Sequence, residues 1–185
     1  MATTETKATT PAAGTYTIDP SHSAVSFTVR HLMVSKVRGR IPVTEGRLVV
    51  ADEPTSSTVE ATIDVAGIDT GDPKRDEHLR SADFFETDRY ATAKFVSTKV
   101  EDLGDGEFVL SGDLTIRDHT HPVSFRGEYL GGGQSPWGAS VIGFSAETEI
   151  NRKDWGLEWN VALETGGVLV ADKIKLAIDA EWIKQ

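Results

Sequence analysis

Five histidines are the residues of this 185-residue chain best suited to catalysis or metal binding. Two of them, His119 and His121, are two positions apart, so that on a strand both rings would point to one face. A neighbouring carboxylate such as Asp118 could then complete a metal site. Pro122 follows directly, however, and favours a tight polar turn over residues 118–122 with both rings in solvent. We therefore predict no metal site at these histidines.

The remaining histidines, His22, His31 and His78, could act as general bases only with a nucleophile and an orienting partner. The chain has no cysteine, and it contains no nucleophile elbow around a serine, no zinc-protease helix motif and no glycine-rich phosphate loop. We therefore predict no catalytic residue and no enzymatic activity. A small His-dependent or metal-dependent enzyme that acts on an amphiphile is kept as an alternative hypothesis.

Asp19, His22 and His31 flank the first predicted strand and are better suited to orienting a ligand. A polar headgroup needs only one or two hydrogen-bond partners at the mouth of a pocket. Capping of the first strand and its turn is the simpler interpretation of Asp19 and His22, and the sequence leaves both interpretations open. We predict these three residues as headgroup or mouth candidates.

Alternating side chains indicate the elements that would position these groups. Val25, Phe27 and Val29 alternate with polar residues, and the same two-residue period returns in seven later segments. Such alternation is typical of strands with one apolar and one solvated face. Glycine-rich or polar turns between most of the segments favour antiparallel neighbours. The predicted strands cover residues 22–31, 36–50, 57–66, 92–101, 106–117, 121–130, 138–150 and 168–183.

Two segments interrupt the alternation. Asp72 and Pro73 have the residue types preferred at a helix N-cap and at the first helical position, which predicts a short helix over residues 73–81. Residues 151–167 form a long, tryptophan-containing connection, and such an apolar connection is expected to cover part of the protein. We predict an all-β, eight-stranded antiparallel barrel with a short helix and a long covering loop.

Composition bounds the number of domains and the partners. The length suffices for one domain, which we place at residues 15–185 after a flexible N-terminal tail at residues 1–14. Nineteen Lys and Arg against twenty-nine Asp and Glu leave a net charge of −10, which disfavours nucleic acid and anionic membranes as partners. The tail lacks the apolar region of a signal peptide, and no window is apolar and long enough for stable membrane insertion. We predict a cytoplasmic protein whose oligomeric state, a homodimer included, the sequence leaves open.

Four groups of residues resemble the YceI-like family. They follow one another in order over roughly residues 15–183, so that together they are far more specific than any single short motif. The groups are Ile18-Asp19-Pro20-Ser21-His22-Ser23 with Val25, Phe27, Val29, His31, Leu32, Met33, Ser35, Val37 and Gly39; Arg75 to Phe85 with Tyr90, Ala93, Phe95 and Ser97; Gly112 to Ile116 with Thr120, Pro122 and Val123; and Ile150, Arg152, Asp154, Trp155 and Gly156.

The resemblance implies a lipocalin-like barrel that holds a polyisoprenoid, an isoprenoid quinone or a similar long-chain amphiphile in its interior. It implies no cofactor besides this lipid ligand, and a function in non-enzymatic binding, storage or transport. The chain departs from the family pattern in two places. Many relatives carry an export signal, which residues 1–14 lack, and Trp155 stands where the family usually has Phe in an Asp-Phe-Gly step.

A hollow or a filled interior would imply different functions. An eight-stranded barrel is either filled by its own side chains or wide enough for one small ligand. A filled barrel that serves as an interaction module is therefore a third hypothesis, and the family resemblance favours the hollow barrel. The predicted lining of the apolar bore comprises Phe27, Val29, Leu79, Phe84, Phe85, Phe95, Leu114, Ile116, Ile142, Phe144, Trp155 and Ile178.

Overall fold

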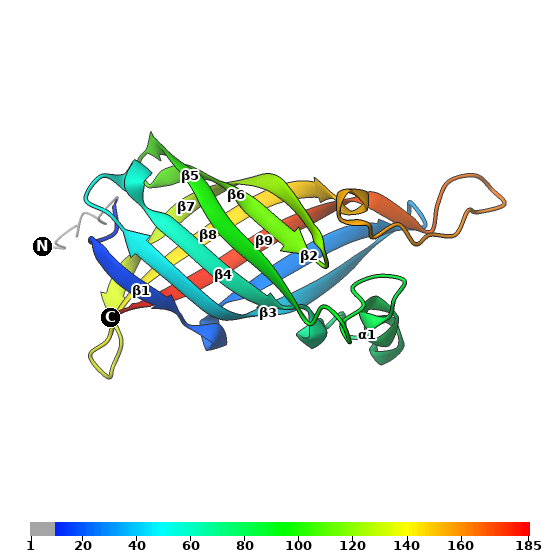
Figure 1. Ribbon diagram of the computed structural model, residues 1–185, viewed down its shortest axis with the longest axis horizontal. Coiled ribbons are helices and arrows are strands. Elements are labelled where there is room, and N and C mark those ends of the chain that lie inside the picture. Colours follow the sequence, from blue (N-terminus) through cyan, green and yellow to red (C-terminus); the bar gives the residue numbers. More distant parts are fainter. Residues whose placement is uncertain (1–9) are drawn as a thin grey trace, which may run out of the picture.

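The computed structural model describes residues 10–185, which form one closed sheet with a short helix at one end (Figure 1). The strands are β1 (Gly14–Ile18), β2 (Ala24–His31), β3 (Ser35–Val50), β4 (Thr58–Asp64), β5 (Thr92–Gly104), β6 (Glu107–Ile116), β7 (His119–Gln134), β8 (Ser140–Asn151) and β9 (Val170–Lys184). The helices are α1 (Pro73–Arg80) and the short 3-10 turns η1 (Pro20–His22), η2 (Pro54–Ser56), η3 (Val65–Gly67) and η4 (Arg152–Trp155).

All neighbouring strands are antiparallel, and β2 pairs with both β3 and β9, so that the sheet closes into a barrel. β1 also lies between β3 and β9, further along the same two strands. β1 and β2 therefore occupy a single strand position that η1 interrupts. The predicted eight-stranded barrel is confirmed, and its strands correspond to β2–β9, whereas the alternation does not predict β1.

A buried serine bridges the break between β1 and β2. Asp19 caps η1, because its carboxylate accepts a hydrogen bond from the backbone N–H of Ser21 at 2.9 Å. Ser23 is almost fully buried, and its hydroxyl accepts a hydrogen bond from the backbone N–H of Glu181 in β9 at 3.0 Å. A side chain thus satisfies a backbone group that the interrupted strand leaves without a ladder partner.

Strand register collects the apolar side chains on the inner face of the barrel. In β2, Val25 and Phe27 lie opposite Ile178 and Leu176 of β9. Residues directly opposite each other in a sheet share a face, so the apolar sets of neighbouring strands coincide. The intervening positions of β2 and β3 carry polar and charged side chains that face outward. The barrel therefore has an apolar interior and a solvated exterior.

Helix α1 marks one end of the barrel, which we call the α1 end, and both described chain termini lie at the opposite end, which we call the β1 end (Figure 1). The Asp72 carboxylate accepts hydrogen bonds from the backbone N–H groups of Lys74 and Arg75. Arg80 ties the helix to the barrel by donating from Nε to the carbonyl oxygen of Ala66 at 2.7 Å. The predicted short helix is confirmed.

The connection between β8 and β9 divides into two halves. In the first half, Trp155 is 2% exposed, and its Nε1 donates to the carbonyl oxygen of Leu114 at 2.9 Å. The second half, residues 160–169, projects beyond the barrel as a narrow loop that a bridge between Ala162 and Val168 holds together (Figure 1). The first half therefore packs on the barrel as expected, whereas the second half points away from it.

The predicted turn over residues 118–122 is wrong. The turn between β6 and β7 consists of Arg117 and Asp118, and β7 already begins at His119. Arg117 adopts a φ of 56°, a left-handed conformation that hairpin turns usually assign to Gly or Asn. His119 and His121 are therefore strand residues, opposite positions of β6 whose side chains are buried.

Candidate functional site

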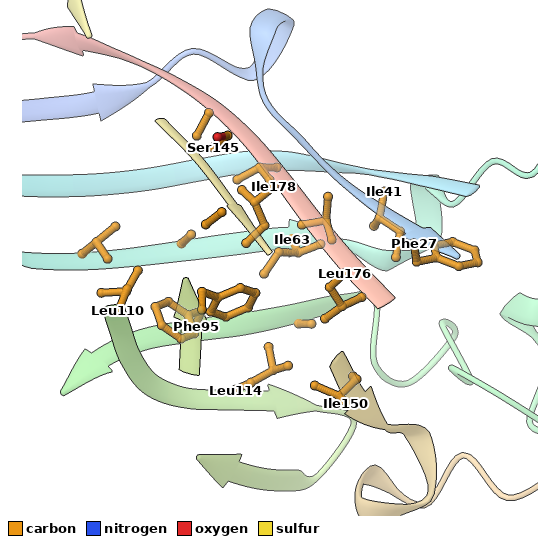
Figure 2. Close-up of a pocket in the computed structure, with 18 of the residues that line it drawn as sticks. Phe27, Ile41, Ile63, Phe95, Leu110, Leu114, Ser145, Ile150, Leu176 and Ile178 are labelled. Carbon is orange, nitrogen blue, oxygen red and sulfur yellow. The ribbon is translucent and has the colours of Figure 1, made fainter. Parts of the chain in front are cut away.

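A cavity of about 770 Å³ extends through the barrel between its two ends. Its lining includes Leu157 and Trp159 at the α1 end and Pro11 and Phe108 at the β1 end. Figure 2 shows side chains from opposite walls around this shared space, nearly all of them hydrocarbon. Those labelled are Phe27, Ile41, Ile63, Phe95, Leu110, Leu114, Ser145, Ile150, Leu176 and Ile178. The described side chains thus leave the bore hollow, which contradicts the filled-barrel hypothesis.

Glycines in the wall give three phenylalanine rings room to lie against it. We call these contacts the ring–glycine pairs: Phe27 with Gly39, Phe95 with Gly112 and Phe108 with Gly127. A Cβ atom at Gly127 would lie 2.5 Å from Cζ of Phe108, far closer than carbon atoms approach. The ring therefore occupies the space that a side chain at the glycine would need. Because the rings use this space, they take up less of the bore.

The cavity includes nearly all of the predicted lining. Ile142 and Trp155 are the exceptions. Ile142 is buried opposite Trp182 in the pairing of β8 with β9. Trp155 packs edge-on against His121, with 5.3 Å between the ring centroids. The predicted residues that do line the cavity are Phe27, Val29, Leu79, Phe84, Phe85, Phe95, Leu114, Ile116, Phe144 and Ile178. Their contact with a ligand stays a prediction.

The charged groups of the lining separate by sign between the two ends. The basic residues whose side chains can face the cavity gather at the α1 end and are His31, Lys74, Arg75, His78 and Arg152, whereas Arg30 borders the cavity with its side chain directed outward. The acidic residues gather at the β1 end and are Asp52, Asp102 and Glu107. Apolar side chains line the wall of the cavity between the two groups. The cavity therefore has a positive and a negative end, although the whole chain carries a net charge of −10.

Aromatic rings surround His78 at the α1 end. Its ring meets Phe84 and Trp159 edge-on, with centroid distances of 5.2 and 4.5 Å. Its Nε2 lies 2.8 Å from Oδ2 of Asp83. The three rings connect α1, the segment after it and the β8–β9 connection, so that these separate segments form one rim.

Arg152 joins the β8–β9 connection to the barrel from inside. The side chain is 3% exposed and donates hydrogen bonds to the carbonyl oxygens of Leu157, Trp159 and Ala171, the latter two at 3.0 Å. Burial lowers the pKa of Arg152, and Asp172, whose carboxylate lies 3.6 Å away, opposes this effect. This buried guanidinium fixes the path of the chain around the positive end of the cavity.

Residues at the N-terminal end of the described chain line the cavity at the β1 end. Residues 1–9 of the predicted tail, residues 1–14, lie outside the described part of the chain, whereas Thr10, Pro11 and Ala13 line the cavity and Gly14 begins β1. Tyr129 also lines this end, and burial raises the pKa of its phenol. The phenol is therefore uncharged at neutral pH.

Asp19 and His22 lie at η1 and do not line the cavity. Oδ2 of Asp19 lies 2.9 Å from Nδ1 of His22, and hydrogen bonds from Ser21 and His22 lower the pKa of Asp19 to about 2. The hydrogen bond to Asp19 in turn raises the pKa of His22. Glu181 brings a second carboxylate to the group, and ligand atoms of Asp19, His22 and Glu181 lie within 4.8 Å of one another. Of the three headgroup candidates, His31 is the one that lines the cavity.

Sequence reasoning did not assign Lys74, Arg75, His78 and Arg152 to the lining. A signal was available for Arg152, a charged residue at the start of an aromatic-rich connection. Lys74, Arg75 and His78 of α1 carried no such signal, because their approach to the bore depends on where the barrel ends. Within residues 10–185, no helix has the length and apolar character required to cross a bilayer.

Comparisons with known proteins agree with this architecture. The family model described as YceI-like domain matches residues 16–182. A UPF0312 protein of Vibrio cholerae is 36% identical over 151 residues, which are 79% of this chain and 79% of that protein. The crystal structure of Burkholderia cenocepacia BcnA is similar with a TM-score of 0.74 and 20% identity, over 89% of this chain and 98% of that one.

A second solved structure extends the comparison. A polyisoprenoid binding domain from Saccharophagus degradans, implicated in plant cell wall breakdown, is similar with a TM-score of 0.67 and 14% identity, over 94% of this chain and 100% of that one. Both structural similarities concern the fold, and the family model spans nearly the whole barrel. The resemblance carried by the four motif groups is thereby confirmed. This chain belongs to the YceI-like family.

Proposed function

We propose that this protein is a non-enzymatic binding protein that stores or transports one long-chain amphiphile, with the tail of the ligand inside the barrel. The ligand class is a polyisoprenoid, an isoprenoid quinone or a similar lipid. The observation that carries the proposal is a hollow bore with hydrocarbon walls and charged groups at its two ends. The similar fold of the polyisoprenoid binding domain from Saccharophagus degradans supports the ligand class.

Burial of the tail supplies the affinity in this proposal. Each CH₂ group removed from water contributes about 0.8 kcal/mol, so ten buried carbons contribute about 8 kcal/mol before the cost of ordering the ligand. This corresponds to a dissociation constant near micromolar. The wall has few hydrogen-bonding side chains, and hydrophobic pockets discriminate only weakly between similar ligands. We therefore expect selection by length and shape of the tail.

The separation of charge along the lining predicts the direction of the ligand. An anionic or hydrogen-bond-accepting headgroup is favoured at the α1 end, near His31, Lys74 and His78. The same headgroup would be repelled at the β1 end by Asp102 and Glu107. The tail therefore points toward the β1 end.

Native mass spectrometry of the gently purified protein tests the proposal, followed by organic extraction of any bound molecule. We expect a co-purifying long-chain compound, or stoichiometric uptake of a polyprenyl compound added from solution. A clean mass of the bare protein together with no uptake of added polyprenyl and fatty-acid ligands would contradict the proposed function.

A pair of alanines in neighbouring strands provides matched variants. Ala146 lines the cavity, whereas Ala177 on β9 lies beside Ile178 and faces the outside of the wall. Ala146→Trp should abolish uptake because its ring fills the bore, while Ala177→Trp should leave uptake unchanged. Circular dichroism and the thermal midpoint establish that both variants fold. Equal uptake by both variants would exclude the bore as the binding site.

The proposal assigns no catalytic role to the histidines. His22, His119 and His121, which the alternative enzyme hypothesis requires, are not among the residues that line the cavity. Stoichiometric metal or turnover of an amphiphile that depends on these residues would revive that hypothesis. The cytoplasmic location stays a prediction, and the oligomeric state, a homodimer included, stays open.

A further inference from the structure

We propose that the α1 end carries a docking surface for an anionic lipid bilayer, from which the cavity takes up its ligand. The surface has two parts. The apolar tip consists of Leu32, Met33, Val34 and Val161, and the basic face lies behind it on the outside of β2 and β3. The uptake step rests on the proposed lipid-binding function, whereas the docking itself is argued from exposure, backbone conformation and charge.

The apolar tip is exposed at the projecting end of the molecule. The exposed fraction is 38% for Leu32, 54% for Met33, 84% for Val34 and 46% for Val161. The β2–β3 hairpin adjoins the loop at residues 160–169. The backbone N–H of Leu32 donates to the carbonyl oxygen of Leu169 at 2.9 Å, and the backbone N–H of Leu169 donates to the carbonyl oxygen of Val161 at 3.0 Å. Single exposed apolar residues are common, whereas an adjoining group at a protruding end indicates an interaction surface.

The backbone at the tip is strained. Leu32 and Met33 have φ values of 52° and 61°, and the backbone N–H of Val34 donates to the carbonyl oxygen of His31 at 3.2 Å. A hairpin turn whose two central residues both have positive φ normally contains Asn-Gly, because larger side chains are disfavoured there. This turn instead carries two large apolar side chains that remain partly or mostly in solvent. Contact with an apolar phase outside the protein would favour these side chains and so offset the strain of the turn that presents them.

The basic face gives the docking surface its positive charge. Residues 20–44 contain no Asp or Glu, and Arg30, Lys36, Arg38 and Arg40 alternate along the hairpin with inward residues. Arg30 and Lys36 are directly opposite each other, an arrangement that is unfavourable without a counter-charge. In the part of the chain that the structure describes, none of the four forms an ion pair. An anionic surface would supply the missing counter-charge.

The net charge of −10 does not prevent this contact. At physiological ionic strength, charges in solvent are screened beyond about 8 Å, so a bilayer that touches the tip interacts mainly with the nearest charges. The loop at residues 160–169 contributes one acid, Glu164, against the four cations of the hairpin. Phosphate and carboxylate headgroups are the complementary partner, and the apolar tip distinguishes a bilayer from a polar anion.

Docking at this surface places the positive end of the cavity beside the bilayer. His31 at the end of β2 and Leu169 at the end of the loop adjoin the tip and also line the cavity. An amphiphile could therefore pass from the bilayer into the bore without exposing its whole tail to water, which would cost about fourfold in rate or population per CH₂ group.

Co-sedimentation of the full chain with vesicles tests the docking. One set of vesicles contains phosphatidylcholine alone, and the other contains equal parts of phosphatidylcholine and phosphatidylserine. We expect binding to the anionic vesicles to be several hundredfold stronger at low salt, since four basic residues each contribute about fivefold, and to weaken as the salt concentration rises.

Three variants separate the parts of the surface. Leu32→Asn with Met33→Gly removes two apolar side chains and installs the residues that the turn prefers, so it should fold at least as well and bind about tenfold more weakly. Lys36→Gln with Arg38→Gln should weaken binding about twenty-five-fold at low salt, since each basic residue near an anionic surface contributes about fivefold. Trp137→Ser is the matched control, because Trp137 is 90% exposed in the β7–β8 turn at the β1 end, and it should bind vesicles normally.

Ligand uptake is measured on the same proteins twice, from an ethanolic solution of a polyprenol and from vesicles that contain it. Normal uptake from solution with impaired uptake from vesicles in the tip variant supports the proposal. Equal binding of the wild type to both kinds of vesicle overturns it, as does unchanged vesicle binding by the tip variant. Self-association through the tip without vesicle binding also overturns it and assigns the surface to a second copy. A wild type that binds anionic vesicles but takes up no polyprenol from solution would refute the proposed function and leave the docking intact.

Discussion

The two ends of the barrel share the same strands but differ in charge and in construction. At the α1 end, Arg80 and Arg152 donate hydrogen bonds to backbone carbonyl oxygens of the long β4–β5 and β8–β9 connections, and the lining is basic. At the β1 end, short turns such as that between β5 and β6 join the strands, and the lining is acidic. The strands therefore supply the apolar wall of the cavity, and the connecting segments at its two ends supply the charges that distinguish one end from the other.

Removal of Arg152 should have the largest effect on stability. Arg152→Met keeps the apolar stem but leaves the carbonyl oxygens of Leu157 and Trp159 without their donor, which we expect to cost about 3 kcal/mol. Glu107→Gln is the matched change at the β1 end and should cost less than about 0.5 kcal/mol, because its ion pair with Arg126 is solvent-exposed. Chemical denaturation measures both free energies of unfolding. Equal losses would contradict the difference in construction between the ends.

A methyl group added at a ring–glycine pair should shorten the bore from one end. Gly127→Ala displaces the ring of Phe108 near the β1 end, and Gly39→Ala displaces the ring of Phe27 nearer the α1 end. Each should destabilise the protein by about 2 kcal/mol through overpacking. Gly133→Ala is the control, because a Cβ atom there meets no atom within 4 Å.

The two glycine variants should also differ in ligand preference. Gly127→Ala should weaken binding of long tails more than of short ones, whereas Gly39→Ala should weaken both alike, because every tail passes that point. Affinities for a series of polyprenols of increasing length measure the difference. The opposite pattern would place the headgroup at the β1 end.

Neutralising a charge at the mouth should have a smaller effect, confined to anionic ligands. Lys74→Gln should weaken binding of a polyprenyl phosphate by about 1 kcal/mol, because the side chain is exposed and its charge is screened. Binding of the uncharged polyprenol should not change. Asp102→Asn, the counterpart at the β1 end, should leave both affinities unchanged in titration calorimetry. A larger effect of Asp102→Asn would reverse the inferred direction of the ligand.

Acid should loosen the α1 end slightly. Hydrogen bonds from the backbone N–H groups of Arg75 and Lys74 hold the pKa of Asp72 below its usual value of 3.8. Because this pKa is lowered in the folded state, the cap stabilises fully above the unfolded-state pKa, and the stabilisation is lost as the pH falls through the folded-state pKa. Amide exchange in α1 should therefore accelerate over this range relative to the β5–β6 turn. Asp72→Asn keeps a capping side chain that does not titrate, so it should remove the acceleration.

The strands were predictable because their signal is local. A two-residue alternation appears in any segment with one buried face, and it located every strand from β2 to β9. The alternation does not predict β1, because this strand has only five residues and ends at the break that Pro20 helps to create. The β6–β7 turn was misplaced because Arg117 adopts a positive φ without the usual glycine. The start of α1, by contrast, depends on adjacent residues, and Asp72 and Pro73 predict it correctly.

The candidate site was only partly predictable, because its decisive features depend on distant contacts. Alternation identifies inward residues such as Phe95, but whether they meet at the axis depends on space across the barrel. Gly112 leaves room for that ring from a neighbouring strand, and no local pattern connects the two residues. The separation of charge was equally hidden, since His78 and Arg152 approach the same mouth from segments far apart in the chain.

Because η1 interrupts the first strand position, β1 is a part of the wall that can separate from the rest of the barrel. β2 pairs with both β3 and β9 independently of β1, so β1 can separate while the ring of strands stays closed. Thr10, Pro11 and Ala13 would leave with it and uncover the acidic end of the bore. We therefore expect β1 to open as an independent unit, at a lower free energy than global unfolding, and hydrogen exchange in Tyr16 and Thr17 to report this opening. A tail longer than the cavity would then have an exit behind the N-terminal strand.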